Sequence, residues 1–343
     1  MNREHAHPLD ERRGHANAVR VLLFDARGED RRLDDPRDLD LNGLSEHELA
    51  WVDLCAQGPQ DSEAAIRALG LDVPSIAPLF DAKAEPLLLH QEWFAARAIV
   101  ACWDAEHDKV TGIPWLLVVG RNVVVTAHKD ALPFLDALAG NHDNGSRVGE
   151  LDADSFAITL LDRMLTAYYD ALDDFENRLD QLEVDILEDR VHGRHVPHLR
   201  RLRRAVSMFR RLLSSHRDLF DALRRPDFRP DRDDEIDARY RAISARYERA
   251  MDTVENARDL VIGSYVLLET RLSQRTNETM RLLTFVTVLL GTLAVIAGVL
   301  GMNFQATLFK SGSTGFWVTV GSMALAVVVA MIVALRRGWW TRH

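Results

Sequence analysis

The sequence predicts an α+β membrane protein, in which an α/β domain is followed by long helices and two C-terminal transmembrane helices. Short apolar runs with β-type spacing occur only before about residue 150, and a heptad repeat follows later in the chain. Two uncharged runs of 19 and 20 residues, Leu282 to Leu300 and Phe316 to Leu335, lie near the C-terminus. As helices they cover roughly 28 to 30 Å, the thickness of a bilayer hydrocarbon core.

Residues 1–150 are expected to form a cytoplasmic α/β domain. Strand-like runs rich in β-branched residues alternate there with amphipathic pieces, and turn residues from Ala139 to Ser146 form a linker after them. Cys55 and Cys102 are interpreted as buried thiols of a reducing compartment. The expected strands are Val19 to Phe24, Leu49 to Leu54, Ala95 to Cys102, Trp115 to Val119 and Asn122 to Thr126, and the expected helices are Asp61 to Leu69 and Ala131 to Leu138.

Residues 151–230 are expected to form a long antiparallel helical hairpin. Ser155 to Asp189 is strongly acidic, whereas His198 to Arg225 is rich in arginine, and Pro226 and Pro230 end the second helix. The favoured interpretation is a pair of helices held partly by charge complementarity, with each exposed pair contributing a few tenths of a kcal/mol. Attraction of cations by the acidic helix is the alternative.

Residues 231–281 are expected to form a stalk helix. A heptad seam without an internal proline predicts that this helix leaves the cytoplasm and continues into the first span, and a coiled-coil-like stalk implies that several copies assemble around an axis. Ile236, Tyr240, Ile243, Tyr247, Ala250, Val254, Ala257, Val261, Ser264 and Leu268 form this seam.

Arginines predict the orientation in the membrane. Three of them, Arg271, Arg275 and Arg281, precede the first span, whereas the connecting loop at residues 304–315 carries only Lys310. The second span, residues 316–336, leads into a basic tail at 337–343. The positive-inside rule therefore places both termini in the cytoplasm and the loop outside.

The first span, residues 282–303, has two different faces. Bulky residues such as Phe285, Leu289 and Leu293 lie on one side, and small or weakly polar residues lie on the other. The small face is explained either by close packing of transmembrane helices or by the lining of a pore. The small or weakly polar face comprises Asn277, Met280, Thr284, Thr287, Gly291, Ala294, Gly298 and Met302.

Composition and motifs argue against several functions. A net charge of -10 disfavours nucleic acid as a partner. The chain has no Gly-rich phosphate loop, no zinc-protease signature and no assignable nucleophile with a base, so neither an enzyme nor a bound cofactor is expected. A membrane-anchored cytoplasmic sensor or enzyme without a pore remains a distant alternative.

Three histidines spaced by three residues lie between the acidic and basic helices. His192, His195 and His198 have a spacing that could hold Zn²⁺, but Gly193 and Pro197 interrupt the helix that would align them. A solvated loop is the simpler interpretation, and a metal site is the alternative.

Gly301-Met302-Asn303-Phe304 directly follows the uncharged run Leu282 to Leu300. This motif, the stretch Asn277 to Thr284 before it and the basic Arg336 to Trp340 after the second span resemble the CorA family of divalent cation channels. The resemblance extends to the stalk, to the hairpin and more loosely to the α/β domain with its Trp51-Val52-Asp53-Leu54 strand.

The resemblance implies a homopentameric funnel in the bacterial inner membrane. Five first spans would surround a central pore, with the second spans outside them facing lipid. Gly301, Met302 and Asn303 would form the selectivity filter, in which five Asn303 amides recognise a hydrated cation. Asn277 and Met280 match the inner constriction of the family, and Met280 with Leu283 could gate by dewetting.

The expected transported ion is Mg²⁺, with Co²⁺ or Ni²⁺ as further ions. Magnesium-type members commonly carry a Met-Pro-Glu-Leu loop after the motif, whereas Gln305 to Gly315 here has no acidic residue and one basic residue, Lys310. An acid-free loop also occurs in the ZntB branch, so Zn²⁺ transport is the alternative.

Overall fold

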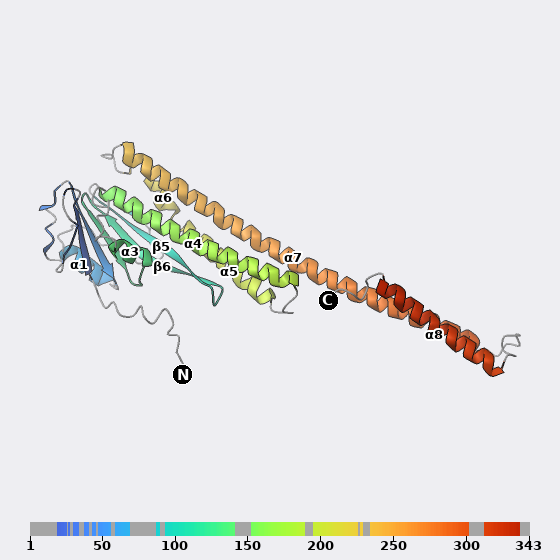
Figure 1. Cartoon of the computed structure of the whole chain (residues 1–343). Helices are drawn as coiled ribbons and strands as arrows, with labels where there is room; N and C mark the ends of the chain where they lie inside the picture. The colour runs from blue at the N-terminus through green and yellow to red at the C-terminus, as the bar shows by residue number, and fades with distance from the viewer. Residues whose placement is uncertain are drawn as a thin grey trace, which may run out of the picture. The chain divides into compact units, whose positions relative to one another are not determined.

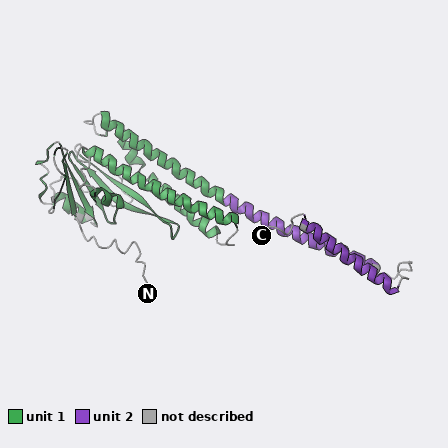
Figure 2. Cartoon of the chain, viewed as in Figure 1, with its two compact units in different colours: residues 1–264 green, residues 265–343 purple. Residues whose placement is uncertain are grey.

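The chain forms an α/β domain with long helices and ends in two apolar helices (Figure 1). It divides into two compact units, Met1–Ser264 and Tyr265–His343 (Figure 2). The computed structural model describes residues 19–25, 27, 30–33, 38–40, 43–45, 47–55, 59–68, 87–89, 93–140, 152–188, 195–225, 227–228, 234–301 and 312–336.

A seven-stranded mixed sheet forms the first unit, with strand order β2-β1-β3-β7-β6-β5-β4. Only the β3–β7 pair is parallel, and each other neighbouring pair is antiparallel. Its strands are β1 (Val19–Asp25), β2 (Arg31–Leu33), β3 (Glu48–Cys55), β4 (Leu87–Leu89), β5 (Phe94–Asp104), β6 (Lys109–Val119) and β7 (Val123–His128). The five strands expected from the sequence are confirmed, and β2 and β4 are additional.

Both faces of the sheet are covered by apolar side chains. On one face, Trp51 packs edge-on against Phe156 of helix α4 (Ala153–Glu188), with ring centroids 5.4 Å apart. On the other face, Val52 and its neighbours form a buried cluster with Ile66 of helix α1 (Pro59–Ala68). The alternation along β3 thus places successive side chains in two different cores.

The remaining helices are long, as the sequence predicts. The hairpin comprises α4 and α5 (His195–Ser214), and a short α3 (Pro133–Gly140) precedes it. Helix α6 (Arg217–Leu223) follows a break at Ser215 and His216, where the sequence alone indicated no interruption. The expected stalk and first span form one helix, α7 (Asp234–Leu300), and α8 (Gly312–Arg336) follows.

The break between α5 and α6 has a physical cause in His216. This residue is fully buried, its Nδ1 lies 3.1 Å from the carbonyl oxygen of Leu213, and its Nε2 accepts a 2.8 Å hydrogen bond from the Ile99 N–H. The carbonyl of the same Ile99 accepts a 3.0 Å hydrogen bond from the Tyr168 hydroxyl of α4. Helix α4 and the break after α5 therefore satisfy the backbone of β5 at a point where β4, which pairs only with residues 94–96, does not reach.

Apolar packing and a shared carboxylate hold the hairpin to the sheet. Phe175 of α4 and Phe209 of α5 are both buried, with ring centroids 6.0 Å apart. Asp108, in the β5–β6 turn at a φ of 49°, is 2.9 Å from Arg178 of α4 and 3.0 Å from Arg201 of α5. Burial alone would raise the pKa of Asp108, but the two guanidinium groups and His198 hold that pKa below its usual value.

The charges of the hairpin therefore act differently from the sequence-based expectation. In the described part of the chain, the ion pairs of α4 and α5 run to the β5–β6 turn and to α7 rather than between the acidic and basic helices. Asp162 of α4 pairs with Arg246 of α7, and Arg210 of α5 pairs with Glu255 of α7 at 2.6 Å. Part of the segregated charge thus serves contacts with other elements.

We predict that His216 makes the fold sensitive to acid. Burial lowers the pKa of His216 from 6.5 to about 4. The unfolded chain then binds a proton that the folded chain excludes, so stability falls as the pH drops from about 6.5 towards 4, by up to about 3 kcal/mol. A His216→Gln variant of the full chain should be less stable at pH 7 but should lose less stability across this window.

Thermal unfolding of the detergent-solubilised protein between pH 4.5 and 7.5, followed by circular dichroism, measures this difference. His107→Gln is the matched control, because the side chain of His107 is 64% exposed. Parallel pH profiles for the wild type and His216→Gln would contradict the prediction.

Candidate functional site

Two helices of the second unit are long and apolar enough to cross a membrane. They are the C-terminal part of α7 and almost the whole of α8. Neither apolar segment is buried inside the protein, as expected for helices that face lipid or other copies. The two spans predicted from the sequence are therefore present as helices of the predicted type.

In the apolar segment of α7 the partly covered residues lie on the bulky face, from which we infer that α8 packs there. Phe285, Leu289 and Leu293 are the half-buried residues of this segment, and they recur every four residues. On α8 the covered positions recur every three or four residues in the same way, as is typical of two helices that pack along one seam. These positions are Gly315, Thr319, Met323, Val327, Ala330 and Ala334.

The small-residue stripe of α7 stays uncovered. We call the eight residues predicted as pore lining and gate the open stripe, and all eight are exposed: Asn277, Met280, Leu283, Thr284, Thr287, Gly291, Ala294 and Gly298. A Cβ atom added to Gly291 or Gly298 would meet no atom within 4 Å. In the described chain, these glycines therefore do not serve a close approach of α8.

This arrangement argues against close packing within one chain as the explanation of the small residues. If they served packing within one chain, other residues would cover them, but the partly covered residues are those of the bulky face. The open stripe is therefore available for a second copy of the chain or for water. Close packing between copies and the lining of a pore between copies are both compatible with it.

The open stripe combines apolar and weakly polar groups. Met280 and Leu283 are 62% and 65% exposed, which leaves two large apolar side chains near Asn277 without cover in the chain. The hydroxyl of Thr287 donates a 2.8 Å hydrogen bond to the Leu283 carbonyl, so its proton is used inside the helix. Its oxygen still has lone pairs that can accept hydrogen bonds from water.

The motif after the first span lies where α7 ends. Gly301 directly follows the helix, and its N–H donates a 3.0 Å hydrogen bond to the Ala297 carbonyl. A Cβ atom on Gly301 would lie 3.4 Å from this carbonyl oxygen. Met302 and Asn303 lie outside the described residues, so the selectivity filter remains a prediction.

The two described histidines of the predicted metal cluster have different surroundings. His195 begins α5 and is buried, whereas Nδ1 of His198 lies 3.0 Å from the Asp108 carboxylate. His192 lies outside the described residues. Within the described part of the chain, no group of three metal-ligating side chains comes together. The three-histidine site stays a prediction, with His198 used in the contact to Asp108.

A buried polar network in the α/β domain was not singled out from the sequence. Arg20 donates to the Asp53 carboxylate at 2.5 and 3.0 Å, Thr126 donates to it at 2.6 Å, and Nε2 of His128 lies 3.1 Å away. Burial opposes both charges, yet the partners lower the pKa of Asp53 and raise that of His128. Because both carboxylate oxygens of Asp53 have partners, we interpret the network as structural. In the sequence, the signal for it is the single acidic residue Asp53 within the apolar part of β3.

Comparison with known proteins agrees with this architecture. Residues 46–337 match the family described as CorA-like Mg²⁺ transporter protein. The cobalt/magnesium transport protein CorA of Thermotoga maritima is 27% identical over 187 residues, 54% of this chain and about half, 53%, of that relative. The zinc transport protein ZntB of Yersinia enterocolitica is 25% identical over 244 residues, 70% of this chain and 69% of that relative.

A solved structure shares the fold. The CorA magnesium transporter from Methanocaldococcus jannaschii superposes with a TM-score of 0.70 at 18% identity, covering 93% of this chain and 98% of that chain. The α+β architecture of the single chain that the sequence predicts is thereby confirmed, and the family match to residues 46–337 confirms the resemblance. Because the family match extends over most of its length, the chain belongs to the family of CorA-like Mg²⁺ transporter proteins, which are transporters and not enzymes.

Proposed function

We propose that this protein carries divalent metal cations across the bacterial inner membrane through a pore between five copies of the chain. The observation that carries the proposal is that the open stripe of α7 is exposed, whereas residues on the opposite, bulky face are partly covered. In this arrangement the first spans, residues 282–303, surround the axis, and the second spans, residues 316–336, face lipid. Residues 1–281, which form the α/β domain, hairpin and stalk, lie in the cytoplasm with the tail at 337–343.

Asn303 is proposed to select the ion at the outer mouth. Mg²⁺ gives up its bound waters reluctantly, so a ring of amide oxygens can recognise it by accepting hydrogen bonds from those waters. Gly301 and Met302 belong to the same filter. Gly301 lets backbones approach closely, and Met302 supports the ring from below.

The gate is proposed to lie at the cytoplasmic end of the open stripe. Met280 and Leu283 are large, apolar and exposed in the single chain. Five copies of each around an axis would form an apolar constriction that excludes water when narrow. Asn277 lies next to it, and Thr284, Thr287, Gly291, Ala294 and Gly298 line the wider part above.

Mg²⁺ is the proposed ion, and Zn²⁺ is the second candidate. Mg²⁺ is favoured by the family and by the name of the Thermotoga relative. Zn²⁺ is favoured by the similarity to a zinc transport protein and by a loop that carries Lys310 but no acid. Uptake is the expected direction, because each charge moving inward gains about 2.3 kcal/mol per 100 mV of inside-negative potential.

We predict that the open stripe is in contact with water in the assembled protein. In a background lacking Cys55 and Cys102, a Gly291→Cys variant should react with a charged methanethiosulfonate added from the aqueous phase. Leu289→Cys, two residues earlier and on the bulky face, should react at least tenfold more slowly. Equal rates at the two positions, measured by mass spectrometry, would exclude a water-filled stripe.

Removing the Asn303 amide should impair selective uptake. In proteoliposomes with an internal Mg²⁺ indicator, Asn303→Ala is expected to lower Mg²⁺ uptake at least tenfold or to lose its preference over monovalent cations. Gln305→Ala, which removes an amide two residues further on, is the control and should keep wild-type flux. Wild-type flux and selectivity in Asn303→Ala would refute the filter. Running the assay with Zn²⁺ compares the two candidate ions. Adding a pH gradient tests whether transport is coupled to protons.

The full chain should assemble as a pentamer. Native mass spectrometry of the detergent-solubilised protein is expected to give five times the chain mass of 38.8 kDa. The predicted cause is that five open stripes and five stalk helices close around one axis. A monomer at micromolar concentration would be incompatible with a pore between copies.

A further inference from the structure

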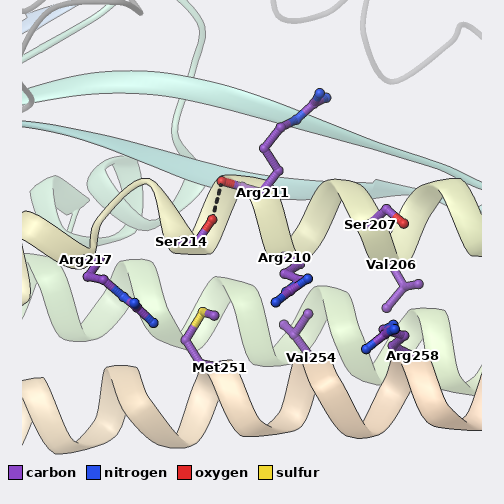
Figure 3. Close-up of a pocket in the computed structure, with 9 residues that line it drawn as sticks. All are labelled: Val206, Ser207, Arg210, Arg211, Ser214, Arg217, Met251, Val254 and Arg258. Atoms are coloured by element: carbon purple, nitrogen blue, oxygen red, sulfur yellow. Dashed lines mark hydrogen bonds between the residues drawn. The ribbon is translucent and has the colours of Figure 1, made fainter.

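A groove rich in arginine lies between α5 and α7 in the first unit, and the transport proposal gives it no role (Figure 3). Its volume is about 500 Å³, within the range of small-molecule sites. We call it the arginine groove; it is lined by Val206, Ser207, Arg210, Arg211, Ser214, Arg217, Met251, Val254 and Arg258.

Positive charge from three elements converges on this groove. Arg210 of α5, Arg217 at the start of α6 and Arg258 of α7 extend into the space between the helices, whereas Arg211 points away from α7 (Figure 3). Val206 and Val254 are buried and form an apolar base. An apolar base lowers the local dielectric constant and strengthens the attraction between arginine and an anion.

A carboxylate of α7 already pairs with two arginines that line the groove. Glu255 lies 2.6 Å from Arg210 Nε and 3.2 Å from Arg258 Nη1, so one acidic group bridges arginines from opposite walls. This contact shows that the two guanidinium groups can bind one anionic group together. Guanidinium groups bind phosphate with the same paired geometry as carboxylate.

Arg217 contributes a positive charge at the other end of the groove. Within the described part of the chain, no carboxylate forms an ion pair with Arg217, which lies near the hydroxyl of Tyr247. The segment from Met251 to Arg258 spans about two helical turns, roughly 10 Å. An anion that contacts both ends must therefore be extended and carry several negative charges, as a chain of phosphates does.

We propose that the arginine groove binds a soluble polyphosphate, either an inorganic one or the phosphate chain of a nucleotide. Two or more phosphates would contact Arg217 and the Arg210–Arg258 pair, displacing or sharing the Glu255 carboxylate. Such a ligand would join α5 to α7, the helix that continues into the proposed pore. An influence on transport would rest on the proposed function, whereas the binding itself does not.

Isothermal titration calorimetry of the full-length protein in nanodiscs, with inorganic tripolyphosphate and with ATP at 150 mM salt, tests the site. We expect saturable binding that Arg217→Ala weakens about tenfold, because it removes charged hydrogen bonds. Arg204→Ala is the matched control, since Arg204 is exposed on the same helix α5 and does not line the groove. Glu255→Gln should tighten binding several-fold by freeing Arg210 and Arg258.

Opposite effects of Arg217→Ala and Glu255→Gln cannot arise from misfolding, and circular dichroism melts of each variant check this directly. No saturable binding, or equal weakening by Arg217→Ala and Arg204→Ala, would overturn the proposal. If the groove binds a lipid headgroup instead, phosphatidylglycerol in the nanodiscs will compete with tripolyphosphate. Replacing neutral lipid with phosphatidylglycerol would then abolish tripolyphosphate binding. The soluble-ligand proposal requires the same affinity in both. Binding without flux would leave this site standing while refuting the transport role.

Discussion

The division of side-chain size between the two faces of α7 is the constraint on which the membrane part depends. A helix in lipid gains little from burying leucine against leucine, so the choice of partner rests on shape and close contact. Phe285, Leu289 and Leu293 give α8 a ridge on which to pack, and the opposite face is left with Gly291 and Gly298. Because one chain leaves that face uncovered, it is available for contact with another copy or with water.

Much of the fold could be predicted from the sequence, because periodicity is local. The heptad seam of the stalk and the two uncharged runs predict α7 and α8. The alternation of apolar and polar residues predicts the longer strands of the sheet. Three-residue strands such as Arg31–Leu33 have too little pattern to be detected. The break at His216 was also missed, since it depends on a hydrogen bond to Ile99, 117 residues earlier in the chain.

The candidate site was predictable to a similar degree and for the same reason. Each residue of the open stripe follows from helical spacing, but which face α8 would cover required its placement in space. Contacts between distant residues were not predictable: Asp108 gathers Arg178 and Arg201 from two helices, and Arg210 meets Arg258 only through Glu255. The charge segregation of the hairpin suggested pairing between its helices, whereas the described pairs go to the sheet and to α7.

The direction in which the open stripe faces is the central claim, and distances between copies test it most directly. Spin labels at Gly291→Cys, on the stripe, and at Leu325→Cys, on the exposed side of α8, can be compared by pulsed electron paramagnetic resonance in nanodiscs. If the stripe lines a central pore, labels at position 291 lie clearly closer together between copies than labels at position 325. Equal distances, or shorter distances at position 325, would contradict a pore formed by α7.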